Sequence, residues 1–192
     1  MSENQNNQNN EQIEELDINH LMQVRIDKLK ELQEQGKDPF EITKFNRTNT
    51  AGEIKADYEK FAEKDVTVAG RIMFIRKMGK ASFFTIKDKT GPIQIYISIN
   101  DIGEDKYNLF KSADIGDIVG VKGKVMKTKT GEVTIKCMEY THLVKALRPL
   151  PEKFHGLTDI EERYRRRYVD LIMNEESKKV AFDRPKIIRC IR

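Results

Sequence analysis

The segment from Val66 to Tyr140 consists largely of short runs in which apolar and polar residues alternate. Side chains of an extended strand point in turn to its two faces, so a period of two predicts half-buried β-strands. Gly, Pro, Asp, Asn and Ser interrupt these runs as turn residues do. Five strands are therefore predicted, at residues 66–76, 82–88, 93–98, 117–126 and 133–140.

A helical pattern at residues 104–113 separates the third predicted strand from the fourth. Three strands, a helix and two more strands are the order of the OB-fold, a five-stranded Greek-key barrel. The fold class predicted is mainly β with flanking helices, with the barrel spanning residues 65–146. Other small barrels are the alternative.

The residues before the barrel are predicted to be helical after a disordered start. The run MSENQNNQNN has low complexity, so residues 1–12 are expected to form a disordered tail and residues 13–64 a helical extension. Apolar residues recur at helical spacing from about Glu11 to Gln35, and Gly36 and Pro39 end that pattern. This helix is expected to pack against the protein rather than against nucleic acid, because its first half is acidic. A second, short helix is predicted at residues 54–63.

The residues after the barrel change pattern again. Two prolines within Leu147–Pro151 indicate an extended linker, assigned to residues 147–157. Thr158 and Glu161 have the spacing of a capping box, which predicts a helix running to about Met173.

A further helix is predicted from Asn174 to the end of the chain. It contains Pro185, which is expected to bend it or to make it restart at Asp183. Its isoleucines have no predicted partner and no cap follows them, which we interpret as a truncated chain.

Charge is distributed unevenly along the sequence. Residues 1–64 carry 9 Lys/Arg against 14 Asp/Glu, residues 65–146 carry 14 against 9, and residues 148–192 carry 12 against 8. An anionic partner is therefore expected at the middle and C-terminal parts. Cys137 and Cys190 are far apart, and no signal peptide or transmembrane segment is recognisable, so a cytoplasmic location is expected.

One face of the predicted barrel has the composition of a reader of single-stranded nucleic acid. Alternation places Arg71, Phe83, Gln94 and Tyr96 outside, on the first three strands, with Ser98 beyond them. Arg76 follows at the end of the first strand. An aromatic ring can stack on a base, an amide can bond to its edge, and an arginine can contact phosphate. The alternative is that Phe83 packs under a loop and Gln94 is merely solvated.

The connection between the last two strands is the most basic part of the barrel. Lys127 and Lys129 lie within it, and Lys122 and Lys124 precede it. Such a loop is expected to contact phosphates, although lysines that protect a sheet edge are an alternative. Glu132 is interpreted either as a residue that suits the turn or as an acceptor for a base amino group.

No catalytic or metal-binding motif is present. There is no phosphate-binding glycine loop or nucleophile motif, and the three histidines show no ligand spacing. Catalytic and metal residues are therefore predicted to be none. The basic run Arg163–Arg167 is open to a helix-surface role or to contact with tRNA or a second subunit.

Several stretches together resemble bacterial class II lysyl-tRNA synthetases, over about residues 20–192. The segments 143–157 and 159–171, which contain KFHGL and ERYRRRYVDL, resemble the hinge of that family. The stretches VAGRIM at 68–73, GKASF at 79–83, IQIY at 93–96 and KTKTGE at 127–132 resemble its anticodon-binding domain.

The resemblance implies an enzyme that activates lysine with ATP and Mg²⁺, esterifies tRNA-Lys and acts as a homodimer. It implies that Phe83 stacks on an anticodon base and Gln94 reads a base. It also implies anticodon-binding roles for Arg71, Arg76 and Glu132. Residues 158–192 would begin the catalytic domain, with the dimer-interface helix called motif 1 starting near Glu176 and interrupted unusually by Pro185. Motifs 2 and 3 would lie beyond Arg192, so this chain is expected to bind tRNA without aminoacylating it.

Three alternatives compete with this interpretation. Aspartyl- and asparaginyl-tRNA synthetases share the barrel, but KFHGL and KTKTGE favour lysine. A stand-alone module that binds single-stranded nucleic acid would be expected to end in a helix cap or a polar tail, whereas this sequence ends within a predicted helix. A barrel that binds only proteins would leave the Arg71, Phe83 and Gln94 face without a role.

Overall fold

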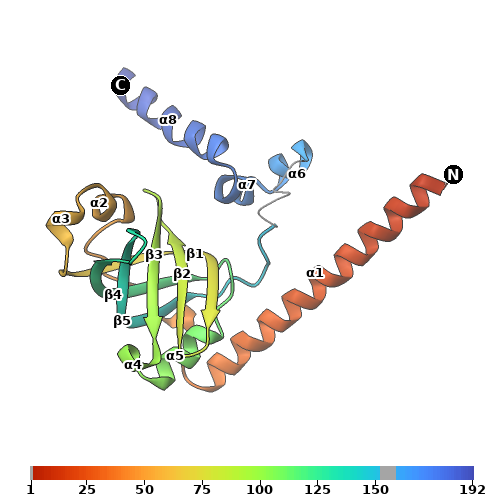
Figure 1. The fold of residues 1–192 in the computed structure, drawn as a ribbon. Coiled ribbons are helices and arrows are strands. Elements are labelled where there is room, and N and C mark those ends of the chain that lie inside the picture. Colours follow the sequence, from red (N-terminus) through yellow and green to blue (C-terminus); the bar gives the residue numbers. More distant parts are fainter. Residues whose placement is uncertain (1, 152–158) are drawn as a thin grey trace. The chain divides into compact units, whose positions relative to one another are not determined.

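A computed structural model describes residues 2–151 and 159–192 of the 192-residue chain (Figure 1). The chain divides into two compact units, one ending at Pro149 and the other beginning at Leu150. The first unit contains the barrel, and the second contains three helices.

The barrel consists of five strands: β1 (Asp65–Met78), β2 (Ala81–Lys87), β3 (Pro92–Ser98), β4 (Ile118–Lys127) and β5 (Val133–Val144). They close in the order β1-β2-β3-β5-β4, with every pair antiparallel except β3 and β5. Helices α4 (Ile99–Ile102) and α5 (Glu104–Lys111) connect β3 to β4. The prediction of an OB-fold with a helix after the third strand is confirmed.

Alternation along the strands produces the core. The buried side chains include Val66, Val68, Ile72, Phe84, Ile86, Ile93, Ile95 and Ile97, as the sequence predicted. Tyr107 and Phe110 of α5 are also fully buried and pack against this cluster. Ser98 is a correction, since it is 5% exposed rather than outward-facing. Its hydroxyl donates to Asp101 Oδ2 at 2.6 Å, because β3 ends there and α4 begins.

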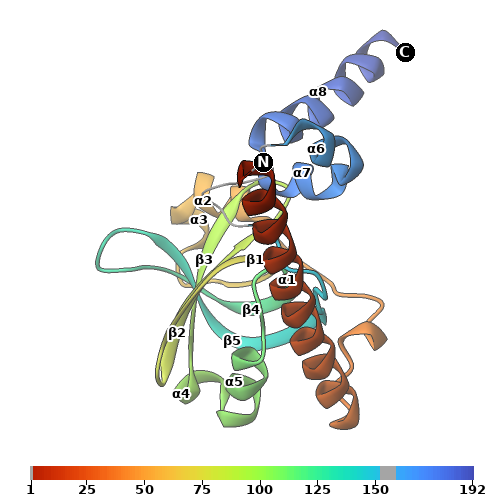
Figure 2. The same ribbon diagram turned by 90° about the vertical axis from the view of Figure 1, so that its right-hand side faces the viewer.

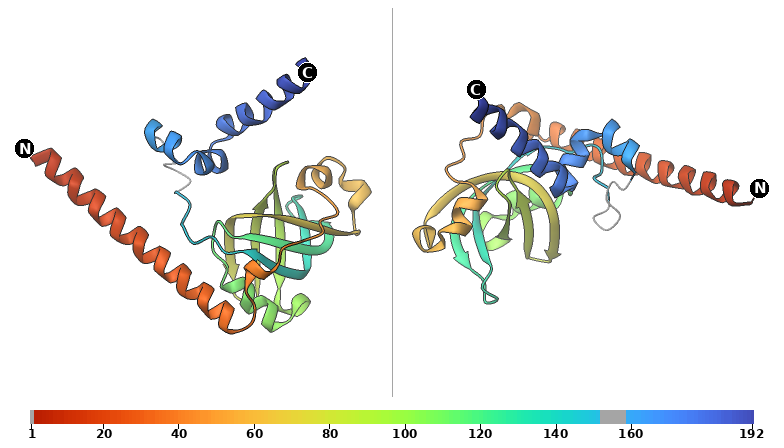
Figure 3. Two further views of the ribbon diagram at one scale, coloured as in Figure 1. Left: turned by 180° about the vertical axis from the view of Figure 1, so that it is seen from behind. Right: turned by 90° about the horizontal axis from the view of Figure 1, so that it is seen from above.

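Two further short helices, α2 (Ala51–Ala56) and α3 (Tyr58–Phe61), precede β1 and replace the single helix predicted at 54–63. Thr50 and Glu53 form a capping box at the start of α2. Figures 1 and 3 show α2 and α3 at one end of the barrel and α5 at the other.

Helix α1 (Ser2–Glu34) and the short 3-10 helix η1 (Pro39–Glu41) lie at the N-terminus. The disordered tail predicted for residues 1–12 is not what the structure describes, because α1 already begins at Ser2. No glycine or proline occurs before Gly36, so no residue type interrupts the helix. Of the apolar residues predicted to pack, Leu32 is buried, whereas Leu21 and Val24 are exposed.

The second unit contains α6 (Ile160–Arg165), α7 (Arg167–Met173) and α8 (Glu175–Ile191). The single helix predicted to reach Met173 is divided at Arg166. Thr158 lies outside the described residues, and the N-cap of α6 is Asp159, whose carboxylate accepts from the Glu161 amide at 2.9 Å. Helix α8 continues through Pro185 and does not restart at Asp183.

Candidate nucleic-acid interface

Two rows of outward side chains cross four neighbouring strands of the barrel. Because paired residues on adjacent strands point to the same face, the register defines these rows. The first row is Arg76, Phe83, Tyr96 and Lys136. The second is Phe74, Thr85, Gln94 and Thr134, of which Thr134 is fully buried. The core row between them is Ile75, Phe84, Ile95 and Ile135. The rows bring Phe83 and Gln94 onto one face, as alternation predicted.

A β-bulge in β1 places two members of these rows on the outer face. Ile72 pairs with Ile86 and Phe74 pairs with Thr85, so Met73 is an extra residue in β1. Strict alternation from Ile72 would turn Phe74 and Arg76 inward, yet both are exposed. The bulge therefore gives this face an aromatic ring and a guanidinium that the period of two does not predict.

A groove of about 460 Å³ runs over this face and under the β4–β5 connection. Figure 2 shows that connection extending away from the barrel. The groove is lined mainly by the outward residues of β1 to β3 and by the loop: Phe74, Arg76, Phe83, Gln94, Lys129 and Glu132. Aromatic rings, an amide and basic groups in one groove are the components that bind single-stranded nucleic acid.

The Phe83 ring is half-buried and lies against Tyr96, with centroids 5.1 Å apart and an interplanar angle of 54°. Phe83 also lies directly across from Arg76 in the β1–β2 pairing. The Tyr96 ring packs against one side of the Phe83 ring and holds it in place. The groove on the other side leaves ring area on which a base can stack.

Gln94 is held by two hydrogen bonds. Its Nε2 donates to Glu132 Oε2 at 3.0 Å, and its Oε1 accepts from Thr134 Oγ1 at 2.8 Å. The Glu132 amide in turn donates to Thr128 Oγ1 at 3.1 Å, within the turn that Gly131 closes at φ 84°. Gln94 and Glu132 were both predicted site residues, and the structure places them in direct contact.

The predicted residue Arg71 does not line this groove. Its Nη1 donates to the Gly116 carbonyl at 2.7 Å, near the start of β4. Burial lowers the pKa of its guanidinium, and the charge of Asp117 opposes that change. Arg71 thus lies before the bulge and supports the α5–β4 turn, whereas Arg76 lies after the bulge and lines the groove.

The two predicted phosphate contacts differ in their surroundings. The Lys129 side chain lines the groove. The Lys127 ammonium lies 4.2 Å from the centre of the Tyr58 ring, which is a cation–π contact with helix α3. Lys129 is therefore the lysine better placed to meet a ligand in the groove.

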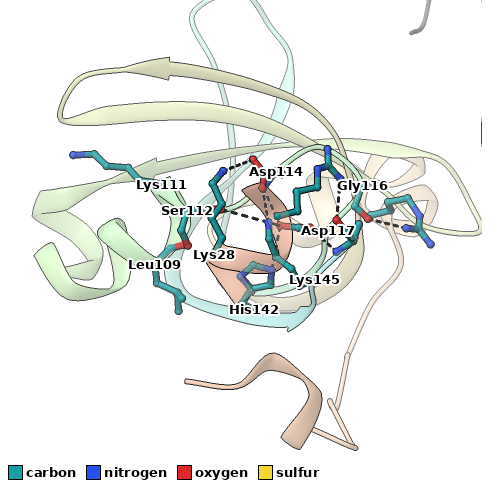
Figure 4. Close-up of polar contacts among 12 residues, drawn as sticks. Lys28, Leu109, Lys111, Ser112, Asp114, Gly116, Asp117, His142 and Lys145 are labelled. Atoms are coloured by element: carbon teal, nitrogen blue, oxygen red, sulfur yellow. Dashed lines mark hydrogen bonds and ion pairs between the residues drawn. The ribbon is translucent and has the colours of Figure 1, made fainter. Parts of the chain in front are cut away.

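A mostly buried cluster of polar and charged side chains, formed by Asp114, Asp117, His142 and Lys145, lies at the α5–β4 turn (Figure 4). Lys145 Nζ lies 2.6 Å from Asp114 Oδ2 and 2.8 Å from Asp117 Oδ2. Lys28 of α1 reaches Asp114 Oδ1 at 2.7 Å. The cluster therefore joins α1, the turn and the end of β5, close to the carbonyl that holds Arg71.

Sequence reasoning missed Phe74, Thr134 and the buried cluster. Phe74 is exposed because of the bulge in β1, which the period of two does not predict. In the cluster, Lys145 pairs with two aspartates that lie 28 and 31 positions earlier in the chain. No local sequence pattern predicts such distant pairs.

The five-stranded barrel is an OB-fold, and residues 66–143 match the tRNA anti-codon family, described as an OB-fold nucleic acid binding domain. The chain is similar to the lysine–tRNA ligase of Clostridium novyi (strain NT), with 52% identity over 93% of this chain and 35% of that protein. It is 51% identical to the lysine–tRNA ligase of Clostridium tetani, over 93% of this chain and 36% of the relative. These similarities confirm the predicted resemblance to lysyl-tRNA synthetases.

The chain spans about a third of the length of the curated relatives it matches. No helix in the described ranges is both long and apolar enough to cross a membrane. Within the same ranges, no three His, Cys, Asp or Glu side chains gather as a metal site.

Proposed function

We propose that the barrel of this chain reads the anticodon of tRNA-Lys as part of a lysine–tRNA ligase. The observation that carries the proposal is the placement of Phe83 and Gln94 on adjacent strands of one groove, in a domain similar to those of lysine–tRNA ligases. In this proposal Phe83 stacks on a base and Gln94 bonds to a base edge.

The remaining predicted residues are assigned by their positions. Arg76 and Lys129 line the groove and are proposed to contact phosphate or a base. Lys127 is proposed to approach phosphate at the edge of the loop, and Arg71 to support the α5–β4 turn beside the groove. Glu132 is proposed to act through the hydrogen bond that it accepts from the Gln94 side-chain amide.

The domain assignment is part of the same proposal. Residues 13–64 form an N-terminal extension, residues 65–146 the anticodon-binding domain, and residues 147–157 a hinge. Residues 152–158, which include most of this hinge, lie outside the described residues. Residues 158–192 begin a class II catalytic domain with its motif 1 helix.

The whole enzyme is proposed to be a cytoplasmic homodimer that uses ATP and Mg²⁺ to attach lysine to tRNA-Lys. This chain by itself is proposed to bind tRNA-Lys and not to aminoacylate it.

Binding to anticodon stem-loops tests the proposal. The chain should bind the stem-loop of tRNA-Lys more tightly than that of tRNA-Asp. Phe83→Ala should weaken the lysine stem-loop by about five-fold to more than a hundred-fold, since stacking on one base contributes roughly 1–3 kcal/mol. Phe40→Ala, which removes an exposed ring of η1 outside the groove, is the matched control and should bind normally.

The alternatives give different results in the same assay. A stand-alone single-strand module would bind both stem-loops equally, with strong salt dependence and no response to Phe83→Ala. An aspartyl- or asparaginyl-type domain would respond to Phe83→Ala but would not prefer the lysine stem-loop.

A further inference from the structure

The Gln94 amide is held in one orientation by two neighbouring side chains. Glu132 Oε2 accepts from its nitrogen, and the Thr134 hydroxyl donates to its oxygen. Thr134 Oγ1 also lies 3.2 Å from the Glu132 carbonyl oxygen, so the three side chains form one compact network. Gln94 and Glu132 line the groove that contains Phe83, and Thr134 is buried beneath them.

The chemistry of Glu132 determines which end of the amide faces it. A carboxylate has only acceptor atoms, whereas a hydroxyl such as that of Thr134 can donate or accept. A Gln94 amide rotated by half a turn would place its oxygen against the Glu132 carboxylate, which is repulsive. The assignment of nitrogen toward Glu132 therefore follows from hydrogen-bonding capacity.

A fixed amide presents donor and acceptor in a fixed order. After its two bonds, Gln94 retains one N–H and one oxygen lone pair for a ligand. Uracil offers a ring N–H beside a carbonyl oxygen, and cytosine offers an amino group beside a ring nitrogen acceptor. The two bases thus present opposite orders of donor and acceptor, and an amide that cannot rotate accepts only one of them.

We infer that Glu132 is a specificity-determining positioning residue, which holds the Gln94 amide so that it distinguishes uracil from cytosine at one anticodon position. Thr134 completes this arrangement by occupying the amide oxygen. The inference rests on the proposed anticodon-reading function and deepens it. It differs from direct recognition of a separate base by Glu132, because positioning makes Glu132 and Gln94 act on the same base.

The anticodon of tRNA-Lys suits the test, since its second and third bases pair with the two adenines that begin both lysine codons and are therefore uridines. Three stem-loops are used: the natural one, and one with cytidine at each of these positions in turn. Binding is measured for the unmodified chain, Gln94→Ala, Glu132→Gln and the double variant. Glutamine at position 132 keeps the shape of glutamate but can face the amide with a donor or an acceptor.

Bidentate readout typically discriminates between bases by about five-fold to a hundred-fold. Glu132→Gln should reduce the uridine-to-cytidine affinity ratio about five-fold or more, at the same position that Gln94→Ala affects. The double variant should lose no more discrimination than Gln94→Ala alone. Thr134→Val should lower the ratio at that position, and Glu139→Gln, an exposed glutamate of β5, should change nothing.

A second readout needs no RNA. The side-chain amide signals of Gln94, identified by their loss in Gln94→Ala, should shift in the nitrogen–proton NMR spectrum of Glu132→Gln and not in that of Glu139→Gln. The rest of the spectrum should be retained, which shows that the variants fold.

Three results would overturn the inference. Glu132→Gln changing discrimination at a different position from Gln94→Ala would make Glu132 a direct reader. Additive losses in the double variant would separate the two residues, and unchanged ratios in Glu132→Gln would remove its role. Failure of the proposed function itself looks different, because the unmodified chain would then show no preference for tRNA-Lys and no response to Phe83→Ala.

Discussion

Lys145 Nζ lies 2.8 Å from Asp117 Oδ2, and neither side chain is exposed to solvent. Asp117 Oδ1 also accepts from the Ala146 amide at 2.8 Å, and its Oδ2 accepts from the Asp114 amide at the same distance. The carboxylate therefore connects the turn before β4 to the end of β5.

Lys145→Met should lower the free energy of unfolding by about 3 kcal/mol or more. Methionine fills similar space but leaves the buried Asp117 without its ammonium partner, and breaking a buried pair from one side typically has this effect. Urea unfolding measures the loss. Lys124→Met, at an exposed position of β4, is the control and should stay close to the unmodified chain. Equal stabilities for the two variants would mean that the pair contributes nothing.

The same carboxylate should make stability depend on acid pH. Burial alone would raise the pKa of Asp117, but the His142 ring 3.2 Å away and the charge of Lys145 lower it from 3.8 to about 2. A lowered pKa stabilises the folded protein above the unfolded value, and this contribution is lost as pH falls from about 4 toward 2. The contribution is about 2 kcal/mol.

Urea unfolding at pH values across that range, for the unmodified chain and Asp117→Asn, measures the contribution. The variant should be less stable at neutral pH, and the difference between the two proteins should shrink in acid. A difference that stayed constant down to pH 2 would show that Asp117 does not titrate in this way.

Lys129→Gln should reduce the salt dependence of stem-loop binding more than Lys127→Gln does. Each phosphate contact that is lost lowers the slope of log affinity against log salt by about one. Lys129 lines the groove, whereas the Lys127 ammonium already lies over the Tyr58 ring. Titrations at several salt concentrations provide the slopes, and a larger effect at Lys127 would place the ligand toward α3 instead.

The two arginines of β1 should separate binding from stability. Arg76→Gln should weaken stem-loop binding several-fold and leave the unfolding midpoint almost unchanged, because Arg76 is exposed in the groove. Arg71→Gln should lower the free energy of unfolding by about 1 kcal/mol, since it removes a charged donor from the Gly116 carbonyl. A loss of binding in Arg71→Gln and a loss of stability in Arg76→Gln would contradict the separate roles that we assign to the residues before and after the bulge.

Gly123→Ala should destabilise the barrel by about 2 kcal/mol or more. A Cβ at Gly123 would lie 2.0 Å from the Lys136 carbonyl oxygen of the neighbouring strand, and backbone cannot yield as a flexible side chain does. Thermal unfolding compares it with Lys122→Ala, its exposed neighbour. A variant as stable as Lys122→Ala would show that β4 and β5 separate there without cost.

The strands and their two faces were predictable because each depends on local alternation. Phe84, Ile86 and the three isoleucines of β3 are buried because alternation places them on the inner face of the barrel. Phe83 and Gln94 share one face because β2 and β3 form a simple antiparallel pair, whose register follows from a short turn.

The rest depends on features without a local signature. The exposure of Phe74 follows from one extra residue in β1, which no propensity scale marks. The contact between Gln94 and Glu132 follows from the parallel pairing of β3 with β5, which brings together residues 38 positions apart. The ion pairs of Lys145 likewise require the closed barrel before they exist.

Met73 makes the composition of the groove depend on a count of residues rather than on their chemistry. Before it the odd-numbered positions of β1 face outward, and after it the even-numbered ones do. If β1 paired regularly through Met73, without the bulge, every side chain of the groove would still be in the sequence, yet Phe74 and Arg76 would turn toward the core. Recognition by this face therefore depends on the parity of one strand as well as on the residues that the strand contains.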